Sequence, residues 1–117
     1  MKKTILIIAL LLLIPQMAYS HAYLIDSNPQ EAATLTEPPQ KVTLVFLGFL
    51  EHVFSKVEVY DNEGSKVSGP PELRDEEDGT EITAGLEGLH RGQYTVKWSV
   101  LSKDGHKQDG SYTFTIK

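Results

Sequence analysis

The segment from Gly92 to Leu101 most constrains the fold, because hydrophobic and polar side chains alternate along it from Gln93 to Val100. Successive side chains of a β-strand point to opposite faces, so this period of two predicts a strand with one buried face. Shorter segments with strand character lie at 41–47, 54–60, 80–84 and 112–116. No convincing helical periodicity follows residue 20. The sequence therefore predicts an all-β sandwich or barrel.

The connecting segments carry turn residues. Asn28-Pro29 marks a turn, and 30–40 is expected to be irregular. Residues 65–80 are expected to form a solvated loop. Their acidic run is not expected to bind calcium, because it lacks the alternating ligand spacing of an EF-hand. Trp98 is expected at the centre of the core. The apolar run 44–50 is expected to be buried on both faces, with an exposed docking patch as the alternative.

The chain contains no cysteine, which excludes disulfides, thiolate metal ligands and cysteine nucleophiles. A small domain without disulfides depends on packing alone, which favours a regular sandwich. The formal charge of −5 becomes −7 when Lys2 and Lys3 are removed with the leader described next. This acidic balance argues against a nucleic-acid partner, which would call for a basic surface.

The first 20 residues have the features of a secretory signal peptide. Lys2 and Lys3 precede an apolar run of ten residues, Ile5–Ile14, which is too short to span a bilayer. Ala18 and Ser20 fit the small-x-small cleavage rule. We predict cleavage after Ser20 and a mature domain at 21–117 that begins with His21. No later segment is long enough to cross a membrane, so the mature form is expected to be exported and soluble.

An N-terminal histidine carries two nitrogen donors, the α-amine and the imidazole Nδ1, which together close a six-membered chelate ring on a metal. Amine and imidazole nitrogens in a tetragonal arrangement suit Cu(II). The α-amine has an ordinary pKa of about 7.7–8.0, so copper can displace its proton near neutral pH. The alternative is that the cleavage site falls beside His21 by chance.

The loop Ser102-Lys103-Asp104-Gly105-His106 precedes the last predicted strand. Asp-Gly is a common hairpin-turn dipeptide, so the loop can be purely structural. A carboxylate and an imidazole separated by one glycine can also converge on one ion. With His21, Asp104 and His106 make a set of three nitrogens and one oxygen, which is a plausible square-planar Cu(II) site.

The chain resembles the CopC family of periplasmic copper-binding proteins over essentially all of 21–117. The resemblance rests on Gly110, Phe114 and five segments in matching order: 21–24, 27–29, 42–46, 92–98 and 102–106. It implies an immunoglobulin-like Greek-key β-barrel or sandwich of about seven strands. It further implies one Cu(II) per chain, bound by the amine and imidazole of His21 with Asp104 and His106, and it suggests an inner-membrane copper-transport partner.

Two departures from the family pattern narrow this expectation. Leu47 and Gly48 stand where many members carry a carboxylate, so no acidic ligand is expected there. The only methionines are Met1 and Met17, both in the leader, so the mature chain lacks a thioether Cu(I) site. The remaining histidines, His52 and His90, do not match the family motif and are expected to be surface residues.

The leading hypothesis is a periplasmic Cu(II) carrier in copper homeostasis or resistance that catalyses no reaction. A copper-brace oxidative enzyme, like the polysaccharide monooxygenases, also uses an N-terminal and an internal histidine, but it keeps an axial position open for oxygen. The other alternative is an immunoglobulin-like interaction module that binds no metal. The stability of such a module would not respond to copper.

Overall fold

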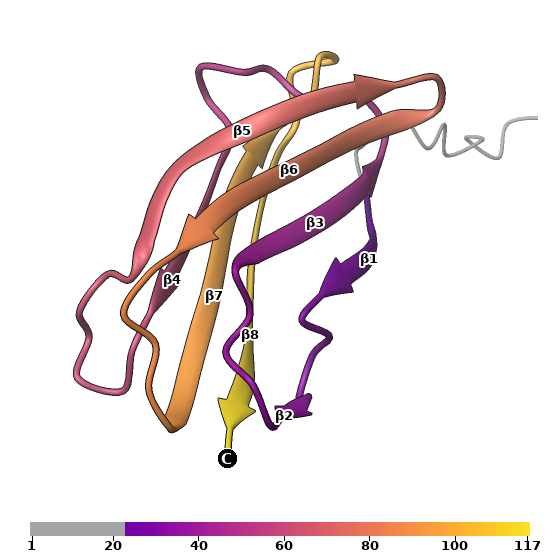
Figure 1. Cartoon of the computed structure of the whole chain (residues 1–117). Helices are drawn as coiled ribbons and strands as arrows, with labels where there is room; N and C mark the ends of the chain where they lie inside the picture. The colour runs from indigo at the N-terminus through magenta and orange to yellow at the C-terminus, as the bar shows by residue number, and fades with distance from the viewer. Residues whose placement is uncertain (1–22) are drawn as a thin grey trace, which may run out of the picture.

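The computed structural model describes residues 23–117, which form eight β-strands in two four-stranded sheets (Figure 1). The strands are β1 (Tyr23–Asn28), β2 (Thr34–Leu35), β3 (Lys41–Leu47), β4 (Lys56–Tyr60), β5 (Ser68–Glu76), β6 (Gly79–Leu86), β7 (Gly92–Leu101) and β8 (Lys107–Ile116). The prediction of an all-β fold is confirmed. Residues 23–117 contain no helix with the length and hydrophobicity that crossing a bilayer requires.

The first sheet has the strand order β1-β3-β6-β5, and the second has the order β2-β8-β7-β4. Neighbouring strands are antiparallel except for the short parallel pair β2 and β8. The hairpins β5–β6 and β7–β8 stay within one sheet, whereas the other connections cross between the sheets. These crossings place strands that are distant in sequence side by side, as in β3 with β6 (Figure 1).

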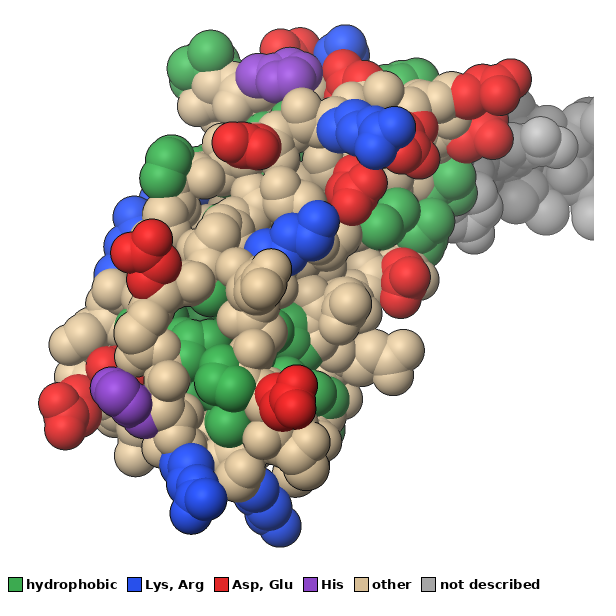
Figure 2. All heavy atoms as spheres, in the orientation of Figure 1, with side chains coloured by type: hydrophobic (Ala, Val, Ile, Leu, Met, Phe, Trp, Pro, Cys, Tyr) green, Lys and Arg blue, Asp and Glu red, His purple; other side chains and the backbone are tan. Residues whose placement is uncertain are grey.

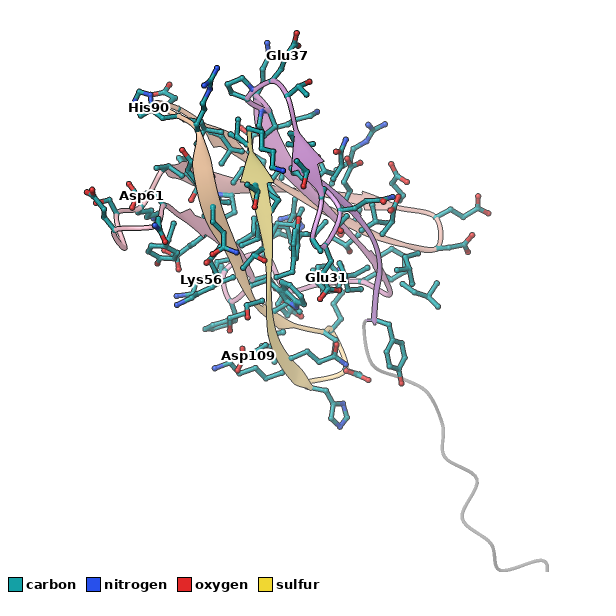
Figure 3. All side chains as sticks on the ribbon, turned by 90° about the horizontal axis from the view of Figure 1, so that it is seen from below. Glu31, Glu37, Lys56, Asp61, His90 and Asp109 are labelled. Carbon is teal, nitrogen blue, oxygen red and sulfur yellow. The ribbon has the colours of Figure 1, made fainter. Side chains whose placement is uncertain are left out.

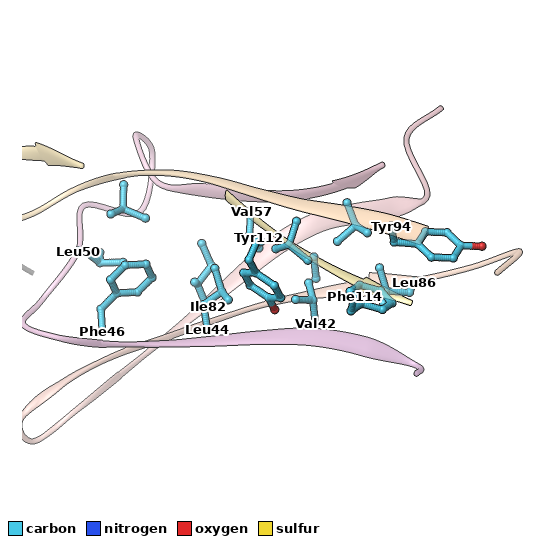
Figure 4. Packing of buried hydrophobic residues seen from close by; sticks show 14 of the residues in the cluster. Val42, Leu44, Phe46, Leu50, Val57, Ile82, Leu86, Tyr94, Tyr112 and Phe114 are labelled. Carbon is cyan, nitrogen blue, oxygen red and sulfur yellow. The ribbon is translucent and has the colours of Figure 1, made fainter. Parts of the chain in front are cut away.

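The core lies between the two sheets and follows the period of two that the sequence shows. On β3, the side chains of Val42, Leu44 and Phe46 are fully buried, and the residues between them are half-buried. Side chains from β6, β7 and β8 pack between the sheets with them (Figure 4). The rings of Tyr94 and Phe114 stack with their centroids 5.4 Å apart. Burial of this apolar surface is the main stabilising term available to a chain without disulfides.

The largest correction to the sequence prediction concerns residues 65–80. Most of this segment is not a loop, because β5 occupies Ser68–Glu76 and pairs with β6. The prolines Pro70 and Pro71 are tolerated because β5 is an edge strand, with one side that pairs with no other strand. The register also shifts between Ser68 and Pro71. The turn expected at Asn28-Pro29 directly follows β1, which ends at Asn28 and whose register against β3 shifts between Leu24 and Asp26.

Two other expectations are refined by the burial pattern. Within the apolar run 44–50, Leu44, Phe46 and Leu50 are buried, whereas Leu47 and Phe49 are exposed. Trp98 is half-buried and borders the core instead of occupying its centre. Its ring lies against Gly110, the residue paired with it on β8, where any Cβ atom would overlap the indole.

A buried hydrogen bond connects the second sheet to the chain that follows β1. The Tyr112 hydroxyl on β8 donates to the Pro29 carbonyl oxygen over 2.6 Å. Burial raises the pKa of Tyr112 to about 12, because the phenolate would lose its hydration. The protonated phenol therefore stabilises the fold below its ordinary pKa of 10, and this contribution is lost as the pH rises from 10 towards 12.

Replacement of Tyr112 by Phe should lower the free energy of unfolding by about 1–3 kcal/mol, because the buried Pro29 carbonyl loses its donor. The variant should also lose less stability than the wild type between pH 10 and pH 12. Urea denaturation across that pH range measures both effects. Tyr60→Phe is the matched control, since Tyr60 bonds to Glu58 on a sheet edge. Equal losses in the two variants would contradict the role assigned to Tyr112.

Candidate metal site

The five-residue loop 102–106 between β7 and β8 is organised by Ser102, which is buried. The backbone N–H of Ser102 donates to the His106 carbonyl over 2.9 Å, and the Gly105 N–H donates to the Ser102 carbonyl over 2.9 Å. The Ser102 hydroxyl accepts from the His106 N–H over 3.2 Å and lies within hydrogen-bond distance of the Asp104 carboxylate. Gly105 has a φ of 91°, which a residue with a Cβ rarely adopts. The backbone of the loop is therefore closed around one hydroxyl group.

This closed loop brings Asp104 and His106 together, as the sequence predicts. The His106 Nδ1 is 3.1 Å from Asp104 Oδ1, and the His106 N–H lies 3.3 Å from the same oxygen. The side chains are 54% and 28% exposed for His106 and Asp104, so an ion from solvent can reach them. The pair can serve a metal in two ways. Either both side chains bind the ion, or the carboxylate orients the imidazole while Nε2 binds.

The third predicted ligand, His21, lies outside the described residues. Residues 23–117 contain no group of three or more histidine or acidic side chains that could hold a metal ion. The structure does show where the described chain begins. Tyr23 pairs with Leu47 at the end of β3, and the segment after β3 reaches the loop through the bridge between Leu50 and Ser102. The start of β1 and the β7–β8 loop therefore lie at the same end of the sandwich (Figure 1).

Of the other two histidines, His52 lies near the loop 102–106, because its partner Asp75 also contacts Lys103, whereas His90 lies at the far end of the sandwich (Figure 3). His52 follows β3, and its Nε2 lies 3.4 Å from Asp75 Oδ2. His90 precedes β7, where its N–H donates to the Tyr94 hydroxyl over 2.7 Å. Figure 3 shows His90 at the opposite end of the sandwich from Asp109, which lies near the start of β8 beside residues 102–106, the metal loop, named for the predicted ligands Asp104 and His106.

Ser102 is a site residue that the sequence prediction did not single out. A weak signal was present, because serine is one of the residues that favour turns. Its burial and its shared contacts with Asp104 and His106 depend on the strands that flank the loop, and no local pattern shows them. Asp75 was not singled out either, because its contact with Lys103 joins β5 to the loop 102–106 and no local sequence pattern shows it.

Comparison with known proteins places the chain in a family. Residues 24–117 match the CopC domain family. Protein YobA of Escherichia coli K12 is 35% identical over 106 residues, which cover 90% of this chain and 86% of that protein. Copper transport protein CutJ of Bacillus subtilis is 26% identical over 113 residues, which cover 96% of this chain but 21% of that protein.

Solved structures show the same fold. The crystal structure of CopC from Methylosinus trichosporium OB3b matches with a TM-score of 0.75 and 32% identity, over 83% of this chain and 94% of that one. PcoC, a methionine-rich copper resistance protein from Escherichia coli, matches with a TM-score of 0.67 and 28% identity, over 83% and 99% of the two chains. The chain belongs to the CopC domain family, and the resemblance seen in its sequence is confirmed.

Replacement of Ser102 by Ala should lower the free energy of unfolding by about 1–3 kcal/mol, because the buried end of the loop loses its shared hydrogen-bond partner. The amides of Gly105 and His106 should then exchange with solvent faster, as hydrogen-exchange NMR can measure. Ser111→Ala, at an exposed position on β8, is the control. Unchanged exchange at both amides would show that Ser102 does not close the loop.

Proposed function

We propose that this protein is an extracytoplasmic Cu(II) carrier that holds one copper ion at the end of the sandwich formed by the β7–β8 loop. The ligands are the α-amine and imidazole of His21 together with Asp104 and His106. The observation that carries the proposal is the approach of His106 Nδ1 to Asp104 Oδ1, 3.1 Å, on a loop closed by buried hydrogen bonds. Cleavage of the leader after Ser20 exposes the α-amine of His21, and the leader directs the protein to the periplasm.

The donor set favours Cu(II) over other common ions. Three nitrogens and one carboxylate oxygen suit a tetragonal ion, and copper stands highest among the divalent metals in affinity for such ligands. Residues 21–117 contain neither cysteine nor methionine, so they offer no soft sulfur ligand for Cu(I). Two matched proteins whose names mention copper, PcoC and CutJ, support copper as the cargo. The protein binds and releases the ion without catalysis.

Mature protein that begins at His21 should bind one Cu(II) per chain in isothermal titration calorimetry. The His106→Ala variant should lose affinity at least tenfold, because it removes a nitrogen ligand. One additional residue before His21 should cause a comparable loss, since the amine becomes an amide at the wrong position. His90→Ala is the matched control, because it removes an imidazole from the opposite end of the sandwich.

The same titrations can distinguish whether Asp104 binds the metal or orients the imidazole of His106. Asp104→Asn keeps the size of the side chain but removes its charge. A loss as large as that of His106→Ala would make the carboxylate a ligand, whereas a smaller loss would make it an orienting partner of the imidazole. A binding stoichiometry near zero in the wild type, or equal affinities in the wild type and His106→Ala, would reject the proposed site.

We further propose that the carrier exchanges copper with an inner-membrane copper-transport protein. CutJ supports this, because the region similar to 96% of this chain makes up only 21% of that longer protein. The connection between β3 and β4 provides a contact surface beside the metal loop. Phe49, Val53 and Phe54 are 39%, 87% and 67% exposed, and the Phe49 carbonyl accepts from the Lys103 N–H over 3.0 Å. Apolar side chains exposed in this way are typical of protein contact sites.

A double variant, Val53→Asp with Phe54→Asp, should bind Cu(II) with wild-type affinity but lose copper exchange with vesicles that contain such a transporter. Ile25→Asp, which also adds a carboxylate at an exposed apolar position, is the control. Copper uptake into the vesicles measures the exchange. Equal uptake from the double variant and the wild type would show that this surface is not the contact site.

A further inference from the structure

The Asp75 carboxylate on β5 connects three segments that are separate in the sequence. Its Oδ1 accepts a hydrogen bond from the Thr80 hydroxyl on β6 over 2.8 Å, and Thr80 in turn accepts from the Leu50 N–H over 3.1 Å. Its Oδ2 lies 3.4 Å from His52 Nε2 and 3.6 Å from Lys103 Nζ. The β5–β6 hairpin, the β3–β4 connection and the metal loop therefore meet at one side chain.

Thr80 makes this position of the carboxylate well defined. The Thr80 side chain is buried, and Asp75 and Thr80 are directly paired across the β5–β6 hairpin. The hydrogen bond from Thr80 lowers the pKa of Asp75, and His52 and Lys103 add to this effect. The carboxylate is therefore ionised and fixed on the side that faces the loop. The position of the carboxylate depends on the hydrogen bond from Thr80, because exposed ion pairs alone contribute little.

Lys103 is the loop residue that this carboxylate holds. It stands directly before Asp104, and its Nζ lies 5.6 Å from the centre of the Phe49 ring as well as near Asp75. Both contacts direct the ammonium group towards the β3–β4 connection and the β5–β6 hairpin. Acidic side chains also gather around the β5–β6 turn in Figure 2, where Glu76, Glu77 and Asp78 lie.

The charge of Lys103 gives this contact a consequence for metal binding. A cation beside Asp104 competes with a metal ion for the carboxylate, and it also repels the ion. Without Asp75, the flexible lysine side chain has Asp104 as the next carboxylate along its own loop. We propose that Asp75 is a positioning residue for the copper site. Asp75 acts by holding the Lys103 ammonium group against the β5–β6 hairpin, away from Asp104. This inference rests on the proposed Cu(II) site.

The test compares Cu(II) affinities of the mature protein and three variants by competition with a chromophoric chelator. Asp75→Asn should bind Cu(II) about tenfold more weakly than the wild type, the range typical of groups that support a metal ligand. Glu76→Gln is the matched control, because it removes one negative charge from the adjacent residue. The double variant Asp75→Asn with Lys103→Gln should regain wild-type affinity, since the competing cation is gone.

Electron paramagnetic resonance of the copper-loaded proteins provides a second readout. Its Cu(II) signals would not change if Asp75 only stabilised the fold. Asp75→Asn should show an additional Cu(II) species that is absent from Glu76→Gln and from the double variant. If Asp75→Asn binds like Glu76→Gln, the inference is overturned while the copper site stands. If the double variant stays as weak as Asp75→Asn, the route through Lys103 is overturned. If the wild type binds no Cu(II), the proposed function itself fails.

Discussion

The antiparallel pairing of β7 with β8 is the constraint on which the candidate site depends. The two strands pair along their whole lengths, from Gly92 with Ile116 to Leu101 with Lys107. Because both strands are held by core side chains such as Val96 and Phe114, their pairing cannot slip by one residue without turning the hydrophobic face outward. Only residues 102–106 remain to close the hairpin. The register of β7 against β8 thus determines where the loop that carries Asp104 and His106 projects from the sheet.

Much of this architecture could be predicted from local patterns. The alternation in 41–47, 92–101 and 112–116 identified three strands, because a half-buried strand must show it. The approach of Asp104 to His106 could also be predicted, since a single glycine between them permits a tight turn. The segment that contains Pro70 and Pro71 could not be identified as a strand in this way. Its prolines are compatible with pairing only at a sheet edge, and that position depends on the whole topology.

Contacts across the sandwich were equally hidden from the sequence. Asp75 and Lys103 are 28 residues apart, and no spacing rule joins them, yet their side chains meet because β5 and the metal loop share one end of the fold. Trp98 was expected at the centre of the core because it is the largest hydrophobic side chain. It borders the core instead, and its ring lies over Gly110, the residue paired with it on β8. In both cases the contact depends on how the strands are arranged in the folded sandwich.

The two prolines on β5 also affect how this protein can meet other proteins. An exposed sheet edge with free N–H groups can recruit a further strand, which leads to uncontrolled assembly. Pro70 and Pro71 lack backbone N–H groups, so this part of the edge strand β5 offers fewer donors to a further strand. Addition of a further strand at this part of β5 is therefore disfavoured, which limits polymerisation through this edge of the sandwich.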